Sequence, residues 1–160
     1  MRRSASRTAA VLVAALAMFA CTGSSGATRD NGVITKGGDV SVKKLEPGDC
    51  FLAPTKVSAD ITTVHAVPCK EQHPMEAYAL VTYDQSDTYP GDKVLGRFAD
   101  GACLEKYSDY VGSDYQDSTL YYTYLLPSAR SWQDGKDRTV VCVITTTGEQ
   151  LTKSVKGSQL

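Results

Sequence analysis

The chain has 160 residues, of which 17 are Lys or Arg and 18 are Asp or Glu, so its formal net charge is −1. About 140 residues remain after the N-terminal segment, which is enough for one folded domain and too few for two. No block of basic residues is interleaved with aromatic residues. This charge pattern excludes nucleic acid as an expected partner.

The first residues have the layout of a bacterial lipoprotein signal. Three arginines stand among the first seven residues, an uncharged and mostly apolar run follows over 9–20, and Cys21 leads into a segment rich in Gly and Ser. A helix of about 12 residues covers about 18 Å, which is too short for a hydrocarbon core of about 30 Å. We therefore expect 1–20 to be a signal peptide and Cys21 to carry the lipid that anchors the protein to the extracytoplasmic face of the cell membrane.

Two positions before the cysteine depart from the usual lipoprotein signal. Met18 stands where such signals have Leu, and Phe19 is bulkier than the Ala or Ser that usually follows. The alternative is an ordinary secretory signal cleaved near Ala20 or Ala27, which leaves Cys21 removed or present as a free thiol.

Residues 21–44 are expected to form a flexible, lipid-anchored tether. Thr, Ser, Gly, Asp and Lys dominate this segment and its apolar residues are scattered, so it offers too little apolar surface to offset the entropy of ordering. A turn signal at Leu45-Glu46-Pro47-Gly48 marks the start of the folded domain. We expect this domain over 45–157.

Short extended segments outnumber helical ones in the expected domain. β-Branched residues over 61–67, alternation over 75–83 and 119–126, and the apolar run over 138–147 each predict a strand. Apolar residues at spacings of three and four predict one amphipathic helix over 92–111. This order predicts an α+β fold with two disulfides, in which one amphipathic helix packs on an antiparallel sheet of about five strands.

The same patterns predict which side chains share a face. We expect half-buried strands, each with one core face. These faces comprise Met75, Ala77, Ala79, Val81 and Tyr83 in the first long strand, Leu120, Tyr122, Tyr124 and Leu126 in the next, and Val140, Cys142 and Ile144 in the last.

Four cysteines of the expected domain form an even set, which in an exported protein favours disulfides. Three connectivities are possible, and the entropy of loop closure hardly distinguishes them. Cys50 and Cys69 border the first strand pair, whereas Cys103 lies on the predicted helix and Cys142 on the strand that this helix should cover. We therefore favour Cys50–Cys69 and Cys103–Cys142. No two of the four lie within four residues of each other, so a zinc site is not expected.

Five short motifs occur in a fixed order along the domain. They are Gly48-Asp49-Cys50-Phe51, Val67-Pro68-Cys69, His73-Pro74-Met75-Glu76-Ala77-Tyr78, the segment 131–138 with Cys142 after it, and Ser154-Val155-Lys156-Gly157. In this combination the chain resembles the septum formation family of actinobacterial exported and membrane-tethered proteins, over about residues 47–157. It differs from the family pattern at Gln72, at Lys136 and over 152–154. The resemblance implies a link to cell division or envelope growth, and it supplies no catalytic residue and no ligand.

His73 and Glu76 are the candidates for chemistry. They could form an acid–base pair or a metal site if they shared a helical turn, but Pro74 and the alternation after it favour the start of a strand, which separates them. The structural interpretation is that His73 caps a turn and Glu76 pairs with a basic neighbour such as Arg138. The chain has no Gly-x-Ser-x-Gly elbow, so we expect neither an enzyme nor a cofactor.

Trp132 is the single tryptophan of the chain, and nine tyrosines accompany it. We expect Trp132 to fold back over the sheet, with Asp137 and Arg138 fixing the entry to the last strand. Outward-facing tyrosines such as Tyr121 suit a recognition surface for carbohydrate or protein.

These observations predict a cell-envelope lipoprotein with a noncatalytic binding or assembly role, linked to septum formation or envelope growth. Its expected partners are the membrane, through the lipid anchor, and an envelope or division protein. The alternatives are an envelope enzyme and a small-ligand-binding lipoprotein, both using His73 and Glu76.

Overall fold

A computed structural model describes residues 26–55 and 60–160, so the signal segment and Cys21 lie outside the described residues. The main sheet is antiparallel, with the strand order β3-β5-β4-β6-β8-β7, and a separate two-stranded sheet pairs β1 with β2. The predicted α+β class is confirmed, with six strands in the main sheet and a second, short helix. The elements are β1 (Thr28–Asp30), β2 (Val33–Lys36), β3 (Gly38–Ser41), the 3-10 turn η1 (Val42–Lys44), β4 (Cys50–Phe51), β5 (Thr63–Val67), β6 (Met75–Thr82), α1 (Asp92–Val111), η2 (Tyr115–Asp117), β7 (Tyr121–Leu125), α2 (Ala129–Gly135) and β8 (Thr139–Thr145).

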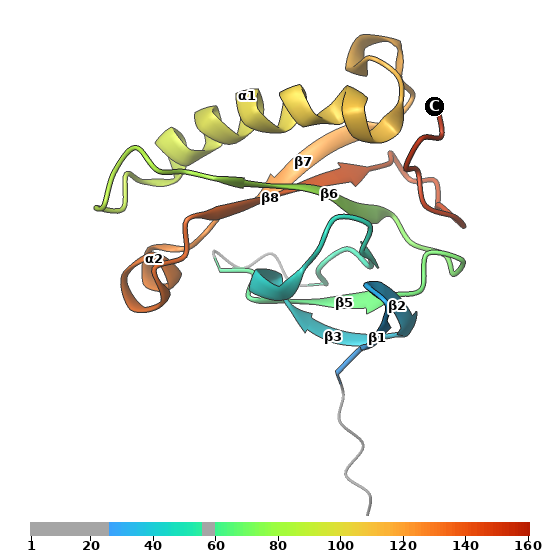
Figure 1. The fold of residues 1–160 in the computed structure, drawn as a ribbon, viewed down its shortest axis with the longest axis horizontal. Coiled ribbons are helices and arrows are strands. Elements are labelled where there is room, and N and C mark those ends of the chain that lie inside the picture. Colours follow the sequence, from blue (N-terminus) through green and yellow to red (C-terminus); the bar gives the residue numbers. More distant parts are fainter. Residues whose placement is uncertain (1–25, 56–59) are drawn as a thin grey trace, which may run out of the picture.

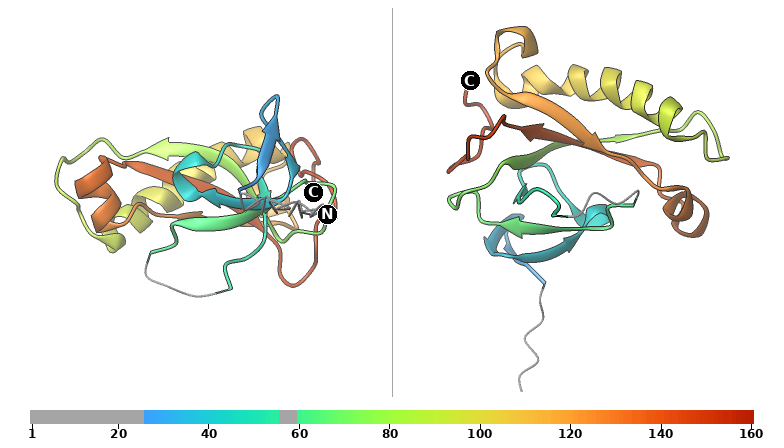
Figure 2. Two further views of the ribbon diagram at one scale, coloured as in Figure 1. Left: turned by 90° about the horizontal axis from the view of Figure 1, so that it is seen from below. Right: turned by 180° about the vertical axis from the view of Figure 1, so that it is seen from behind.

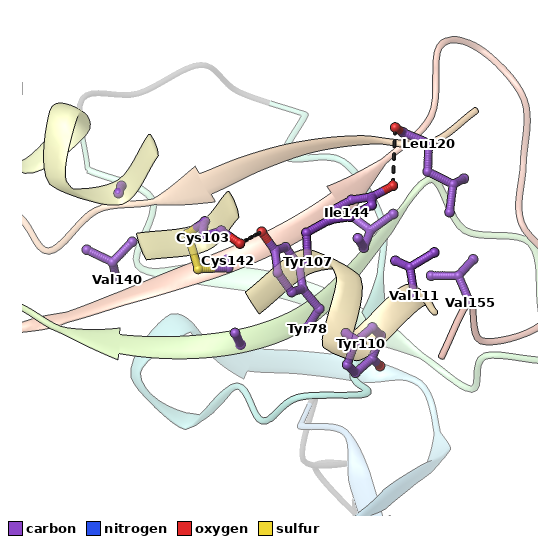
Figure 3. Packing of buried hydrophobic residues seen from close by; sticks show 12 residues of the cluster. Tyr78, Cys103, Tyr107, Tyr110, Val111, Leu120, Val140, Cys142, Ile144 and Val155 are labelled. Carbon is purple, nitrogen blue, oxygen red and sulfur yellow. Dashed lines mark hydrogen bonds between the residues drawn. A yellow bond between two sulfur atoms is a disulfide. The ribbon is translucent and has the colours of Figure 1, made fainter. Parts of the chain in front are cut away.

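The domain is layered, with α1 on one face of β6, β8 and β7 and with β3 and β5 beneath the other face (Figures 1 and 2). One core lies between α1 and the sheet and includes Val140, Cys142 and Ile144 (Figure 3). A second core lies on the opposite face and includes Val141 and Val143. The prediction of half-buried strands is therefore wrong for β8, because the curled sheet covers both of its faces.

A bulge in β6 changes which side chains face the helix. The register with β8 shifts between Ala77 and Ala79, so two steps along β6 oppose one step along β8. Ala77 belongs to the core beneath the sheet, whereas Tyr78 and Ala79 belong to the core under α1. The prediction of a single face from Met75 to Tyr83 is therefore wrong, because an extra residue exchanges the two faces.

The helix predicted over 92–111 is confirmed as α1. Its buried face carries Leu95, Ala99, Cys103, Tyr107, Tyr110 and Val111. Gly96 allows close packing against β7, because a Cβ at this position would lie 3.2 Å from the Tyr124 hydroxyl. Gly112 ends the helix in the left-handed region at φ 87°, where glycine carries no Cβ penalty.

The expected tether is ordered over much of its length. Asn31 and Gly32, at φ 48° and 81°, form the two-residue turn between β1 and β2, a sequence typical of a type I′ hairpin. Ile34 of this hairpin is only 5% exposed, and β3 pairs with β5 along the edge of the main sheet. The predicted domain start at residue 45 is wrong, because a few apolar side chains and the backbone pairing of a sheet edge suffice to order 28–44.

Both predicted disulfides are confirmed. Cys50–Cys69 joins β4 to the end of β5 with a Cα–Cα distance of 5.2 Å, and Cys103–Cys142 joins α1 to β8 at 5.5 Å. Such disulfides indicate an oxidising, extracytoplasmic compartment. Within 26–55 and 60–160, no helix has the length and apolarity that crossing a membrane requires.

Candidate functional site

Glu76 lies at the start of β6 with its side chain fully buried. Its carboxylate accepts hydrogen bonds from the Tyr110 hydroxyl at 2.6 Å, the Ser154 hydroxyl at 2.5 Å and the Val155 backbone N–H at 2.8 Å. One side chain thus joins β6, the last turn of α1 and the C-terminal segment. Burial, strengthened by the neighbouring Glu76, raises the pKa of Tyr110. The predicted pairing of Glu76 with Arg138 is wrong, because hydroxyl and backbone donors satisfy this carboxylate.

His73 is also fully buried. Its backbone forms an antiparallel bridge with Leu151, with N···O distances of 3.0 and 2.8 Å. The ring Nδ1 lies 2.7 Å from the Glu71 carbonyl oxygen, so Nδ1 carries a hydrogen and donates it. His73 and Glu76 therefore use different partners, and the strand start expected after Pro74 is present at Met75. The structure does not join the two residues into an acid–base pair.

The exposed histidine has its own partner. His65 in β5 places Nδ1 3.0 Å from the Asp39 carboxylate on the neighbouring strand β3. Both side chains are about half exposed. His65 therefore lies at the sheet surface, away from the buried motif residues.

A buried ion pair was missed in the sequence analysis. Asp49 is 1% exposed, and both of its oxygens accept hydrogen bonds from Arg29 at 2.7 Å. The Glu46 backbone N–H donates to the same carboxylate at 2.8 Å, and this pairing raises the pKa of Arg29. The one available signal was the acidic residue inside the Gly-Asp-Cys motif. Its partner lies 20 residues earlier, in the expected tether.

Trp132 is 2% exposed and packs at the end of the sheet. The Arg138 guanidinium lies 3.7 Å from its ring centroid, and Nε1 donates to the Asp87 carbonyl at 2.9 Å. Arg138 donates to the carbonyls of Trp132 and Asp87 at 3.0 Å. Asp137 accepts from the Thr139 N–H at 3.1 Å, at the entry to β8. Asp137 and Arg138 thus lie at the entry to β8, whereas Trp132 packs against Tyr83 and Leu95 at the end of the sheet and not over its face.

The tyrosines of β7 face in two directions, as the alternation over 119–126 predicts. Tyr121, on the edge strand β7, is 47% exposed. Tyr122 instead packs against Tyr107 and Tyr115, with ring centroids 6.3 and 4.9 Å away. Of these two tyrosines, Tyr121 is the more exposed.

A surface depression of ≈ 660 Å³ lies between the β1–β2 hairpin and η1. Arg29, Lys43, Asp39 and Glu46 contribute charges of both signs to its lining, and Leu80 contributes an apolar side chain. Neither His73 nor Glu76 lines this depression. His73 and Glu76 and this depression are therefore separate features of the molecule.

The comparison with protein families gives one match. The family model described as septum formation covers residues 19–154, most of the chain. No curated protein and no solved structure matches the chain. The matched range contains Asp49, His73, Glu76 and Trp132, whose side chains hold the domain together. The chain belongs to the septum formation family.

Proposed function

We propose that this protein is a lipid-anchored component of the cell envelope with a noncatalytic binding or assembly role in septum formation or envelope growth. The observation that carries the proposal is the burial of the polar motif residues. His73 and Glu76 are 0% exposed and Asp49 is 1% exposed. Buried side chains of this kind bond to other groups of the same chain and stabilise the fold. A binding partner would therefore contact other residues, on the surface of the domain.

Burial argues against the enzyme that the sequence left open. A general acid or base has to come within hydrogen-bonding distance of its substrate. The Glu76 carboxylate is occupied by three donors of its own chain. The geometry also argues against a small-ligand site built on His73 and Glu76, since neither residue lines the ≈ 660 Å³ depression.

The edge strand β7 is the surface we favour for the partner. An edge strand offers backbone N–H and C=O groups to a second chain. Tyr121 is 47% exposed on this strand, and tyrosine is enriched at the centres of protein interfaces. An envelope or division protein that supplies an extended segment would fit this edge.

Site-specific crosslinking in growing cells tests the binding role. A photoreactive amino acid at Tyr121 is expected to capture one defined envelope or division protein. The matched control position is Val33, which is 59% exposed on the β1–β2 hairpin. Equal capture at both positions, or none at Tyr121, would reject β7 as the binding surface. The companion variant Tyr121→Ala, without a crosslinker, should keep the melting temperature and no longer co-purify with the partner captured at position 121.

The lipid anchor has a separate test. Wild-type protein should take up a radiolabelled fatty acid and stay with membranes in high salt, because two or more acyl chains give stable anchoring. Cys21→Ala should abolish the label and leave either an unprocessed precursor or a released protein. An unlabelled wild-type protein that washes off with salt would contradict the anchor and support the ordinary secretory signal.

A further inference from the structure

The ring of His73 has one nitrogen that no described group satisfies. Nδ1 donates to the Glu71 carbonyl, whereas Nε2 is buried and lacks a hydrogen-bond partner among residues 26–55 and 60–160. A buried polar atom without a partner carries a free-energy cost. The position of this atom therefore calls for an explanation beyond packing.

The neighbours of the ring are the sulfurs of Cys50 and Cys69. A ring nitrogen of His73 and the two Sγ atoms all lie within 4.8 Å of one another. Cys50 comes from β4, Cys69 follows β5, and His73 is held at the start of β6 by its backbone bridge to Leu151. Three ordered segments thus converge on one point.

The Glu71 carbonyl prepares the histidine to act as a ligand. Metal-binding histidines commonly donate one ring N–H to a backbone carbonyl, which fixes the tautomer and leaves the other nitrogen with its lone pair. The hydrogen bond from His73 Nδ1 to Glu71 has this arrangement at 2.7 Å. Neutral imidazole and thiolate are two of the groups that commonly bind Zn²⁺ in proteins.

We propose that reduction of the Cys50–Cys69 disulfide converts this cluster into a three-ligand site for a thiophilic divalent cation such as Zn²⁺. A dithiol supplies two electrons and two protons. It becomes a disulfide, and the bond between Cys50 and Cys69 breaks to give two thiols. Binding of the cation then releases both thiol protons to solvent, and His73 Nε2 adds its lone pair. In the reverse direction an oxidised disulfide of another molecule takes up the two electrons, together with two protons from solvent, and becomes a dithiol. The bond between Cys50 and Cys69 then forms again and the cation is expelled.

The surroundings of the sulfurs favour a cation over bare thiolates. The Gly48 carbonyl oxygen lies 3.3 Å from Cys69 Sγ and 3.9 Å from Cys50 Sγ. The negative end of this carbonyl dipole would repel two thiolates that lack a positive counter-charge. A divalent cation between the sulfurs removes that repulsion. Cys69 is also partly exposed, which gives a reductant access to one sulfur.

The second disulfide lacks these features. Cys103 and Cys142 are both fully buried, in the core under α1. In the described part of the chain, Cys50, Cys69 and His73 form the one cluster of three such ligand residues. The two disulfides of one domain therefore differ in access and in the presence of an imidazole, which provides an internal control.

The test uses the full chain purified in detergent and treated with a water-soluble phosphine, which opens disulfides without adding a thiol. Co²⁺ is the spectroscopic probe, and Zn²⁺ affinity is measured by competition with a chromophoric chelator. Reduced wild-type protein should bind one cation per chain and show thiolate-to-cobalt charge-transfer absorption, and oxidised protein should show none. Alkylation and peptide mapping should find Cys50 and Cys69 reduced.

Three variants decide which residues bind the cation. The double variant Cys50→Ser with Cys69→Ser keeps the other cysteines and should lose the cobalt spectrum. His73→Gln should weaken Zn²⁺ binding by about tenfold or more, whereas His65→Gln, on the exposed side of β5, should not. The proposal is overturned if the phosphine leaves Cys50–Cys69 intact, if reduced protein binds no cation, or if His73→Gln binds Zn²⁺ as tightly as the wild type. It is independent of the proposed binding role, which crosslinking at Tyr121 tests.

Discussion

Glu76 shows how much one buried side chain can organise. Three donors from two distant parts of the chain converge on its carboxylate. Charged hydrogen bonds of this kind are stronger than neutral ones. Removing the acceptor leaves a buried hydroxyl and a buried backbone N–H without partners, which costs more than the loss of the bonds alone.

Glu76→Ala should therefore lower the free energy of unfolding by about 3 kcal/mol or more, which corresponds to a melting temperature lower by roughly 10 °C for a domain of this size. Thermal unfolding followed by circular dichroism measures the change. Glu105→Ala, at an exposed position of α1, is the control and should stay within about 0.5 kcal/mol of wild type. Similar melting of the two variants would show that the carboxylate does not hold the C-terminal segment.

Trp132 offers a second test at the scale of one residue. The side chain is 2% exposed and packs against Tyr83 and Tyr89. Trp132→Ala should cost about 3 kcal/mol or more through the lost burial and the cavity left behind. Chemical denaturation is the measurement, with Tyr121→Ala as the exposed aromatic control. A cost below about 1 kcal/mol for Trp132→Ala would mean that the indole serves binding more than stability.

At the scale of elements, α1 contains two glycines in different surroundings. A Cβ at Gly101 meets no atom within 4 Å, whereas a Cβ at Gly96 lies 3.2 Å from the Tyr124 hydroxyl. Gly101→Ala should raise the free energy of unfolding by about 0.5–1 kcal/mol, because alanine restricts the unfolded chain and favours the helix. Gly96→Ala should gain less or destabilise, since β7 has to shift. Equal gains in thermal unfolding would contradict the close helix–strand approach.

The elements also show what the sequence could and could not predict. Residues 92–111 were predictable because an apolar face at helical spacing persists through both glycines. The turn at Asn31 and Gly32 was predictable too, from these two residues alone. The polar composition of the segment around them favoured a flexible tether instead. The β6 bulge was not, because Met75 to Tyr83 alternates as in a regular strand and only the pairing with β8 shows the extra residue.

The functional residues, too, were predictable only where a local sequence pattern marks them. The cysteine pairs were predictable because the helix and its covered strand each supply one cysteine. The convergence of His73 on Cys50 and Cys69 was not, because it depends on the order of β5, β4 and β6 in the sheet. The bond between Arg29 and Asp49 was likewise hidden, since nothing in a polar segment indicates which charge will become buried.

On the scale of the whole domain, buried phenols make stability depend on alkaline pH. Burial raises the pKa of Tyr78 and of Tyr110 above the ordinary value of about 10. The unfolded chain therefore loses these protons first as the pH rises. The contribution of these tyrosines to the free energy of unfolding is therefore fully present below about pH 10 and is lost progressively above that value.

The expected decrease in the free energy of unfolding is up to about 1.4 kcal/mol per tyrosine for each pH unit above 10. Denaturant titrations between pH 9 and about pH 11 measure it, and phenolate absorbance should rise together with unfolding. Tyr78→Phe should reduce the slope in part, because Tyr110 and four further tyrosines with raised pKa values remain. A slope unchanged in this variant would show that Tyr78 is ionisable in the folded state.

If Cys21 carries the proposed lipid, the order in the N-terminal hairpin determines how far the domain can move from the membrane. The described chain begins at Gly26, which forms a bridge with Asp39 of β3. In a protein lipidated at Cys21, residues 22–25 are the whole connection, and five Cα steps span at most about 18 Å. The domain would then be held against the headgroups with α1 on its outer side (Figure 1). Partners within the same membrane or the adjoining wall layer would be in reach, and distant ones would have to approach the bilayer themselves.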